Sequence, residues 1–114
     1  MKKIPYKNIN DEDEFWCGSV FRKAGTNLNN PLPEEDFFEY MLFLDNGETD
    51  WMLCAHIDKW EKGTIIAHVK MNKGNGRLTV KAKEFKRSMI RPEEINLWYY
   101  IDDGIRETRI KSNK

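Results

Sequence analysis

Residues 53–69 read LCAHIDKWEKGTIIAHV, and this stretch predicts the central β-hairpin of the fold. Its loop, EKG, suits a type I turn followed by a glycine in the left-handed conformation. Such a loop pairs Trp60 with Thr64 and brings the apolar side chains of both strands to one face. A slip of one residue would turn those of one strand to the opposite face, so burial favours this register. The hairpin is therefore expected to span 51–60 and 64–71.

The same register places the two histidines of the chain face to face. His56 lies opposite His68, and directly opposed residues have Cβ atoms about 4.5–5.5 Å apart, close enough to share a metal ion or a proton. A catalytic zinc ion is usually bound by three protein ligands. The third candidate, Cys54, lies next to Lys70, whose charge repels a cation. We therefore expect a cross-strand histidine pair that holds no metal, and no cofactor.

Turn signals divide the rest of the chain into short strands. The segment 24–36 is rich in Gly, Asn and Pro and predicts a long loop. Helix is expected only in short segments near 33–40 or 84–95. The fold class is therefore α+β and β-rich, a small antiparallel barrel or strongly bent sheet of five to seven strands with one or two short helices. Besides the hairpin, the predicted strands are 14–23, 37–47, 77–85 and 96–104.

Alternation of apolar and polar residues predicts which side chains form the core. In the stretch RLTVKAKEF, every second residue is apolar and the residues between are Thr or Lys. The apolar positions should point inward and the others to solvent. The side chains expected in the core are Trp51, Leu53, Ala55, Ile57, Ile65, Ala67, Val69, Leu78, Val80 and Trp98.

The chain has 114 residues, which suits a single domain over 1–114, with 1–12 and 111–114 as flexible ends. The start, MKKIPYKNINDEDE, has no apolar run of the kind found in signal peptides. No window approaches the roughly 18 apolar residues that cross a bilayer. We therefore expect a cytoplasmic protein without membrane contact, in which Cys17 and Cys54 are free thiols.

Charge is sorted along the chain although the formal net charge is zero. Residues 1–60 carry twelve acidic and six basic side chains, giving −6, and residues 61–114 carry seven acidic and thirteen basic side chains, giving +6. Two interpretations follow. Either the sheet interleaves the halves and their charges cancel, or the protein has one acidic and one basic face.

Motifs of catalysis are missing from the sequence. It contains no Gly-x-Ser-x-Gly, phosphate-binding loop, His-Glu-x-x-His or Cys-x-x-Cys pattern. The adjacent acids Asp102 and Asp103 precede Gly104 and are typical of a hairpin turn. We therefore expect no enzymatic activity and name no catalytic residues.

A basic segment, residues 77–91, suggests a nucleic-acid-binding β-domain as the alternative function. Arg77, Lys81 and Lys83 begin it, and further basic residues flank Phe85. A basic strand beside an aromatic ring can follow a phosphate backbone and stack a base. The other interpretation is a solvated edge strand whose lysines prevent pairing with other chains.

Acidic clusters beside large aromatic residues suggest instead a surface that captures a basic protein. Acids steer association and aromatic rings supply buried contact area. The competing interpretation is a solvated terminus and a helical first turn. The predicted partner-binding residues are Asp11, Glu12, Asp13, Glu14 and Trp16, together with Glu34, Glu35, Asp36, Phe37 and Phe38.

The stretch EEINLWYYIDDG (93–104) resembles a segment of small bacterial proteins of unknown function, some of them grouped with toxin-immunity families. Asn96 and Leu97 stand where that pattern has any residue followed by Asp. The resemblance implies a compact, cytoplasmic, non-catalytic bacterial protein that binds another protein. On that basis the expected function is an immunity protein, a toxin inhibitor whose partner is a basic toxin domain.

Overall fold

The structure is a computed structural model, and it describes residues 2–25, 37–45, 50–57, 62–72 and 78–102. Strands make up more than half of these residues, and the helical segments among them are short. In chain order the elements are β1 (Lys2–Pro5), η1 (Tyr6–Asn8), β2 (Glu14–Trp16), β3 (Val20–Ala24), β4 (Phe37–Leu44), β5 (Trp51–His56), β6 (Ile65–Lys70), β7 (Thr79–Lys81), α1 (Ala82–Met89), η5 (Pro92–Leu97) and β8 (Trp98–Asp102).

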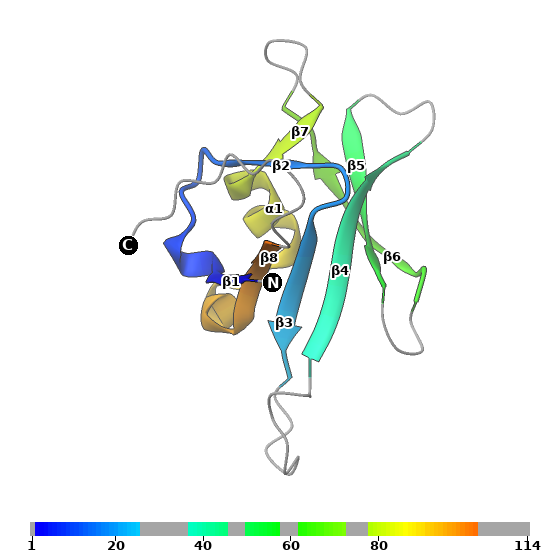
Figure 1. Cartoon of the computed structure of the whole chain (residues 1–114). Helices are drawn as coiled ribbons and strands as arrows, with labels where there is room; N and C mark the ends of the chain where they lie inside the picture. The colour runs from blue at the N-terminus through cyan, green and yellow to red at the C-terminus, as the bar shows by residue number, and fades with distance from the viewer. Residues whose placement is uncertain (1, 26–36, 46–49, 58–61, 73–77, 103–114) are drawn as a thin grey trace.

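Six strands form one antiparallel sheet in the order β1–β8–β3–β4–β5–β6, and β2 pairs with β7 in a separate two-stranded sheet. In Figure 1, α1, β2 and β7 lie on one side of β3 and β4. The prediction of a β-rich α+β fold is confirmed, with eight strands in the described residues instead of five to seven. Within those residues the large sheet stays open, with β1 and β6 at its edges, so no closed barrel forms.

Gly18 divides the stretch predicted as one strand, 14–23, between the two sheets. Its φ of 93° lies in the left-handed region that favours glycine. Ser19 N donates to Trp16 O at 3.0 Å, and Gly18 N donates to Leu42 O at 2.7 Å. The chain therefore leaves the small sheet at β2 and enters the large sheet at β3.

The core fills the space between the inner face of the large sheet and the layer of α1, η1 and the small sheet. On the sheet side, Phe21, Leu42 and Met52 are fully buried. On the helix side, the Phe85 ring stacks on the Phe21 ring with a centroid distance of 3.9 Å. It also meets the Trp98 ring edge-on at 5.9 Å. Aromatic contacts therefore fix α1 against the sheet.

Tyr6 connects η1 to the same core. Its hydroxyl donates a hydrogen bond to the Ala82 carbonyl at 2.7 Å, and its ring stacks on Phe85 at 5.7 Å. Burial, with smaller contributions from Asp11 and Asp13, raises the pKa of the Tyr6 phenol. The hydroxyl therefore keeps its proton and remains a donor to the first turn of α1.

The predicted register of the central hairpin is wrong. In the pairing of β5 with β6, the residue opposite His68 is Leu53, whereas the predicted register placed His56 there. The register shifts just beyond Cys54, where Ile66 is an extra residue in β6 and forms a β-bulge. The opposed histidine pair expected from the sequence is therefore absent.

The end of the hairpin also differs from the prediction. His56 N donates to Thr64 O at 3.0 Å, and Gly63 N donates to His56 O at 2.7 Å. Thr64 therefore pairs with His56, whereas the predicted register paired Thr64 with Trp60. Gly63 does take the left-handed conformation, with φ 89°. The register predicted from the sequence is wrong because all residues of Met52–His56 are buried. A strand that is buried on both faces has no alternating pattern from which register can be read.

Half of the predicted core is confirmed. Leu53, Ala55, Val69, Val80 and Trp98 are buried. Two further residues, Ile57 and Ala67, are half-buried. The prediction is wrong for the three that are exposed, which are Trp51, Ile65 and Leu78.

The predicted strand 77–85 ends early. Only Thr79–Lys81 form strand β7, and the chain then turns into α1. Ala82, Phe85 and Met89 follow a helical spacing that brings them to one face, and all three pack in or against the core. A helix near 84–95 is thus confirmed by α1 and η5, whereas residues 37–40 belong to strand β4 and 33–36 lie outside the described residues. The restriction of helix to these two segments is wrong, because η1 forms a short 3₁₀ helix near the N-terminus.

Within the described part of the chain, no helix has the length and apolar character that a membrane span requires.

Candidate protein-binding surfaces

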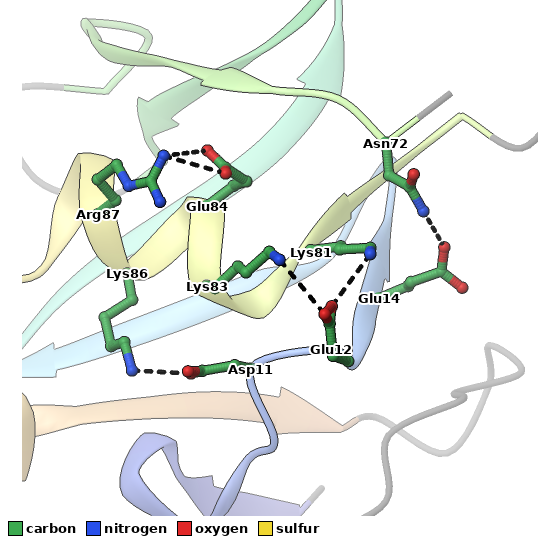
Figure 2. Close-up of polar contacts among 9 residues, drawn as sticks. All are labelled: Asp11, Glu12, Glu14, Asn72, Lys81, Lys83, Glu84, Lys86 and Arg87. Carbon is green, nitrogen blue, oxygen red and sulfur yellow. Dashed lines mark hydrogen bonds and ion pairs between the residues drawn. The ribbon is translucent and has the colours of Figure 1, made fainter. Parts of the chain in front are cut away.

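The acidic cluster near the N-terminus pairs with the basic residues around α1. The Glu12 carboxylate lies 3.0 Å from Lys81 Nζ and 3.3 Å from Lys83 Nζ. The Asp11 carboxylate lies 2.8 Å from Lys86 Nζ. Figure 2 shows the three lysines reaching from β7 and α1 toward the turn that carries both acids.

Backbone hydrogen bonds hold that turn against the beginning of α1. Ala82 N donates to Asp13 O at 2.7 Å and Lys83 N donates to Asp11 O at 3.0 Å. The first N–H groups of a helix have no partner within the helix, and this turn supplies two of them with carbonyl oxygens. The ion pairs of Asp11 and Glu12 are thus part of a contact that begins the helix.

Asp13 and Glu14 lie further inside. Asp13 is buried, and its carboxylate accepts a hydrogen bond from Asn10 N at 3.2 Å. The Glu14 carboxylate accepts hydrogen bonds from Asn72 Nδ2 at 2.7 Å and Thr79 Oγ1 at 2.9 Å. Asp13 therefore stabilises the turn before β2, and Glu14 stabilises the junction of β2 and β7.

The two oppositely charged halves of the chain therefore meet within one molecule. The lysines at 81 and 83 donate hydrogen bonds to Glu12 and lower the pKa of its carboxyl group. Of the two interpretations of the charge pattern, interleaving holds for the part of the chain around α1. An acidic face separate from a basic face does not form there.

The other predicted partner-binding residues lie elsewhere. Trp16 is half-buried opposite Thr79 in the small sheet. Phe37 and Phe38 are half-buried at the start of β4, and the Arg22 guanidinium lies 4.1 Å from the Phe37 ring centroid. Glu34, Glu35 and Asp36 lie outside the described residues. The described members of the predicted set are thus divided between two parts of the fold.

In its described residues, 78–91, the basic segment lacks the long strand and the accessible ring that suggested nucleic-acid binding, and Arg77 lies outside the described residues. Most of it is helix in place of the expected strand. Phe85 is fully buried beneath α1, so its ring cannot stack on a base. Lys81, Lys83 and Lys86 are each paired with a carboxylate.

The two histidines lie on opposite faces of the large sheet. His56 is buried on the inner face, with its ring 4.5 Å from that of Tyr40 and 6.2 Å from that of Phe38. His68 is exposed opposite Leu53 on the outer face. Across the described residues, no three His, Cys, Asp or Glu side chains gather in a group that could hold a metal ion.

The outer face of β4, β5 and β6 carries a cluster of apolar side chains. Cross-strand pairing aligns Met41 with Ala55 and Ile65, and Phe43 with Leu53. The bulge adds Ile66 beside Ile65. We define the outer patch as Met41, Phe43, Trp51, Leu53, Ala55, Ile65 and Ile66.

Three side chains of the outer patch are unusually accessible for their size. Trp51 is 40% exposed, Ile65 49% and Ile66 46%. Neither Leu53 nor Ala55 belongs to the main core, although both are buried. The large sheet therefore has a second apolar face in addition to the one that α1 covers.

Polar groups border the outer patch, and the exposed His68 lies on the same face opposite Leu53. Lys70 lies opposite Trp51, and both line a hollow of about 490 Å³ together with Asp50, Met71 and Asn72. On the β3 side, Arg22 and Glu39 form an ion pair of 3.1 Å. An apolar centre with a polar rim is the usual composition of a protein-binding surface.

Sequence reasoning missed the outer patch because four of its seven residues were expected in the core, namely Trp51, Leu53, Ala55 and Ile65. One signal was available in the adjacent pair Ile65 and Ile66. Side chains alternate along a strand, so two successive isoleucines cannot both face one core unless a bulge intervenes. The bulge in β6 instead turns both toward the outer face.

A scan against protein-family models found no matching family, and searches of curated proteins and of solved structures found no match. The resemblance of residues 93–104 to toxin-immunity proteins therefore stays a prediction from the sequence.

Proposed function

We propose that the protein is a non-catalytic inhibitor that binds another protein through the outer patch, and that it serves as an immunity protein against a cognate bacterial toxin in the cytoplasm. The observation that carries this proposal is the exposure of Trp51, Ile65 and Ile66 on one sheet face. Exposed apolar clusters with a polar rim are typical of protein-interaction sites. An inhibitor of this kind needs no chemistry of its own, because covering an active site is sufficient.

The position of β6 in the large sheet also supports the outer patch as the binding surface. β6 is an edge strand, so its two exposed isoleucines can be approached both from the face and from the side. Trp51 lies beside the hollow at the other end of the hairpin and supplies an anchor of the residue type that dominates binding energies. The three sheet strands of the patch can provide an interface of about 800 Å² per partner, which is the standard size.

The acidic residues first expected to bind the partner have a smaller role in this proposal. Asp11 and Glu12 are accessible, with 60% and 64% of their side-chain surface exposed. Each is nevertheless paired with lysine, and the paired charges cancel most of the field that would steer a basic toxin. Apolar contact at the outer patch, in place of acidic steering, is what we expect to dominate affinity.

Growth rescue tests this function. A bacterial host co-expresses the chain with each protein encoded beside its gene that arrests growth when expressed alone. The wild-type chain should restore growth, and so should the control Lys62→Glu, because Lys62 is exposed in the hairpin loop outside the patch. Ile65→Glu/Ile66→Glu should fail at equal expression. If the wild-type chain does not restore growth, the immunity function is wrong.

A further inference from the structure

His68 stands on the outer face of β6, between the apolar start of the strand and the lysine at its end. Val69, the next residue, points inward and is fully buried. The side chains on the outer face are all exposed, and they are Ile65, Ile66, His68 and Lys70. A titratable ring therefore interrupts the exposed row of the edge strand.

A partner that covers the outer patch also covers His68. Ile65 and Ile66, which we assign to binding, precede it by three and two positions in the same strand. Leu53, another member of the patch, lies directly opposite it in β5. Opposed residues have Cβ atoms about 4.5–5.5 Å apart, and residues two positions apart on a strand face are separated by about 6.6 Å. Contact with the patch therefore brings the imidazole into the interface.

The nearest charged group on this face, among the described residues, is Lys70. It lies two positions from His68 and borders the hollow together with Asp50. The titratable side chains of β5, Cys54 and His56, are buried on the inner face. The helix α1 also packs against the inner face, so its charged side chains belong to the other side of the sheet (Figure 1). A proton on His68 would thus stand beside a like charge on an otherwise apolar surface.

A charged imidazole is unfavourable at this position once a partner covers it. Burial in an apolar contact disfavours the protonated form of histidine, and a like charge nearby disfavours it further. Lysine can extend its ammonium group from the border of an interface into water, because its aliphatic stem is long. The ring of His68 has a single methylene stem and stays beneath the partner. Binding therefore selects the neutral ring.

We propose that His68 makes binding at the outer patch depend on pH, with the neutral ring covered by the partner and protonation opposing the complex. This inference rests on the proposed function, because it requires a partner on the outer patch. Linkage between two binding events is reciprocal, so a partner that prefers the neutral ring binds more weakly wherever the ring is protonated. The complex is thus tightest near neutral pH and loosens in acid.

Calorimetric titration at about pH 7.5 and about pH 5.5 tests the inference, since the ordinary pKa of histidine, about 6.5, lies between them. The toxin whose growth arrest the wild-type chain relieves is titrated with the wild-type chain and with His68→Gln, which carries no charge at either pH. At about pH 5.5 an ordinary imidazole is charged about ten times as often as it is neutral. The affinity of the wild-type chain should therefore fall about tenfold more than that of His68→Gln.

The comparison isolates His68. Groups of the toxin and the buried His56 are the same in both titrations, so their contributions cancel. The lower pH also lies above 4.5, the ordinary pKa of the Glu12 carboxyl group, which the lysines lower further. Circular dichroism of both proteins at the lower pH establishes that they are folded.

A second measurement needs no acid. Diethyl pyrocarbonate acylates accessible neutral imidazoles, and mass spectrometry locates the product. In the free chain it should modify the exposed His68 and leave the buried His56 unmodified, so His56 is an internal control. Bound toxin should protect His68 at least about tenfold, as expected for a side chain within an interface.

The inference is overturned if both proteins lose affinity by the same factor between the two pH values, or if acid strengthens binding of the wild-type chain relative to His68→Gln. It is also overturned if His68 reacts equally in the free chain and in the complex. Growth rescue and tight binding at neutral pH would still support the proposed function in each of these cases. A toxin that does not bind the wild-type chain at either pH would overturn both.

Discussion

Phe85 of α1 stacks on Phe21 of β3 with their ring centroids 3.9 Å apart. This contact connects the helix to the inner face of the large sheet, where Leu42 and Met52 are also fully buried. The helix thereby covers one apolar face of a sheet that has two. The second face is the outer patch, whose exposed side chains we assign to partner binding.

Replacing Phe85 should therefore strongly destabilise the fold. We expect Phe85→Ala to lower the free energy of unfolding by about 3–5 kcal/mol, because it leaves a cavity beneath α1. The measurement is urea denaturation followed by circular dichroism. Leu78→Ala is the control, since Leu78 is 46% exposed. This substitution should lower the free energy of unfolding by well under about 1 kcal/mol. Equal losses in the two variants would contradict the packing described here.

Glu12 should make stability depend on pH in the acid range. The lysines at 81 and 83 lower its pKa below the ordinary value of 4.5. A carboxyl group whose folded pKa is depressed stabilises the fold above its unfolded pKa, and this contribution disappears as pH falls through the folded pKa. The wild-type protein should thus be more stable than Glu12→Gln near neutral pH, and this difference in stability should disappear as pH falls below 4.5.

That comparison is made with urea midpoints of both proteins at several pH values. The difference between them should be largest near neutral pH and vanish in strong acid. A difference that grows with acidification would show that the carboxyl group is not held in its charged form by the lysines.

The two thiols should react at very different rates. Cys17 is exposed, whereas Cys54 is fully buried in β5. Burial raises the pKa of the Cys54 thiol to about 12, so almost none of it is thiolate at neutral pH. A disulfide-exchange reagent monitored by absorbance should therefore give one rapid reaction in the native protein and a second only on unfolding.

Cys17→Ser should remove the rapid phase and leave the slow one. Two thiols that react at the same rate in the folded protein would contradict the burial of Cys54.

The sequence predicts the fold class well and the faces of the hairpin poorly. Turn residues mark the strands because glycine and its neighbours impose local conformations, as Gly63 does in the left-handed region. Register depends on which face is buried, and β5 is buried on both. For this reason the prediction that His56 lies opposite His68 was wrong.

The candidate sites were only partly visible in the sequence for a related reason. Acidic and basic clusters are evident as composition, but which of them face each other depends on the turn that holds Asp11 and Glu12 against α1. That contact joins residues more than 70 positions apart. Alternation alone could not predict it, because α1 begins inside a stretch that alternates like a strand.

The central claim is that the outer patch is the surface that binds the toxin, and calorimetric titration tests it most directly. The toxin whose growth arrest the wild-type chain relieves is titrated with the wild-type chain, with Ile65→Glu/Ile66→Glu and with Lys62→Glu. We expect the double variant to bind at least about a hundredfold more weakly than the other two, as for loss of a hot spot. Thermal unfolding of each variant establishes that it is folded. Undiminished affinity of the folded double variant would show that the partner binds elsewhere and would contradict the assignment.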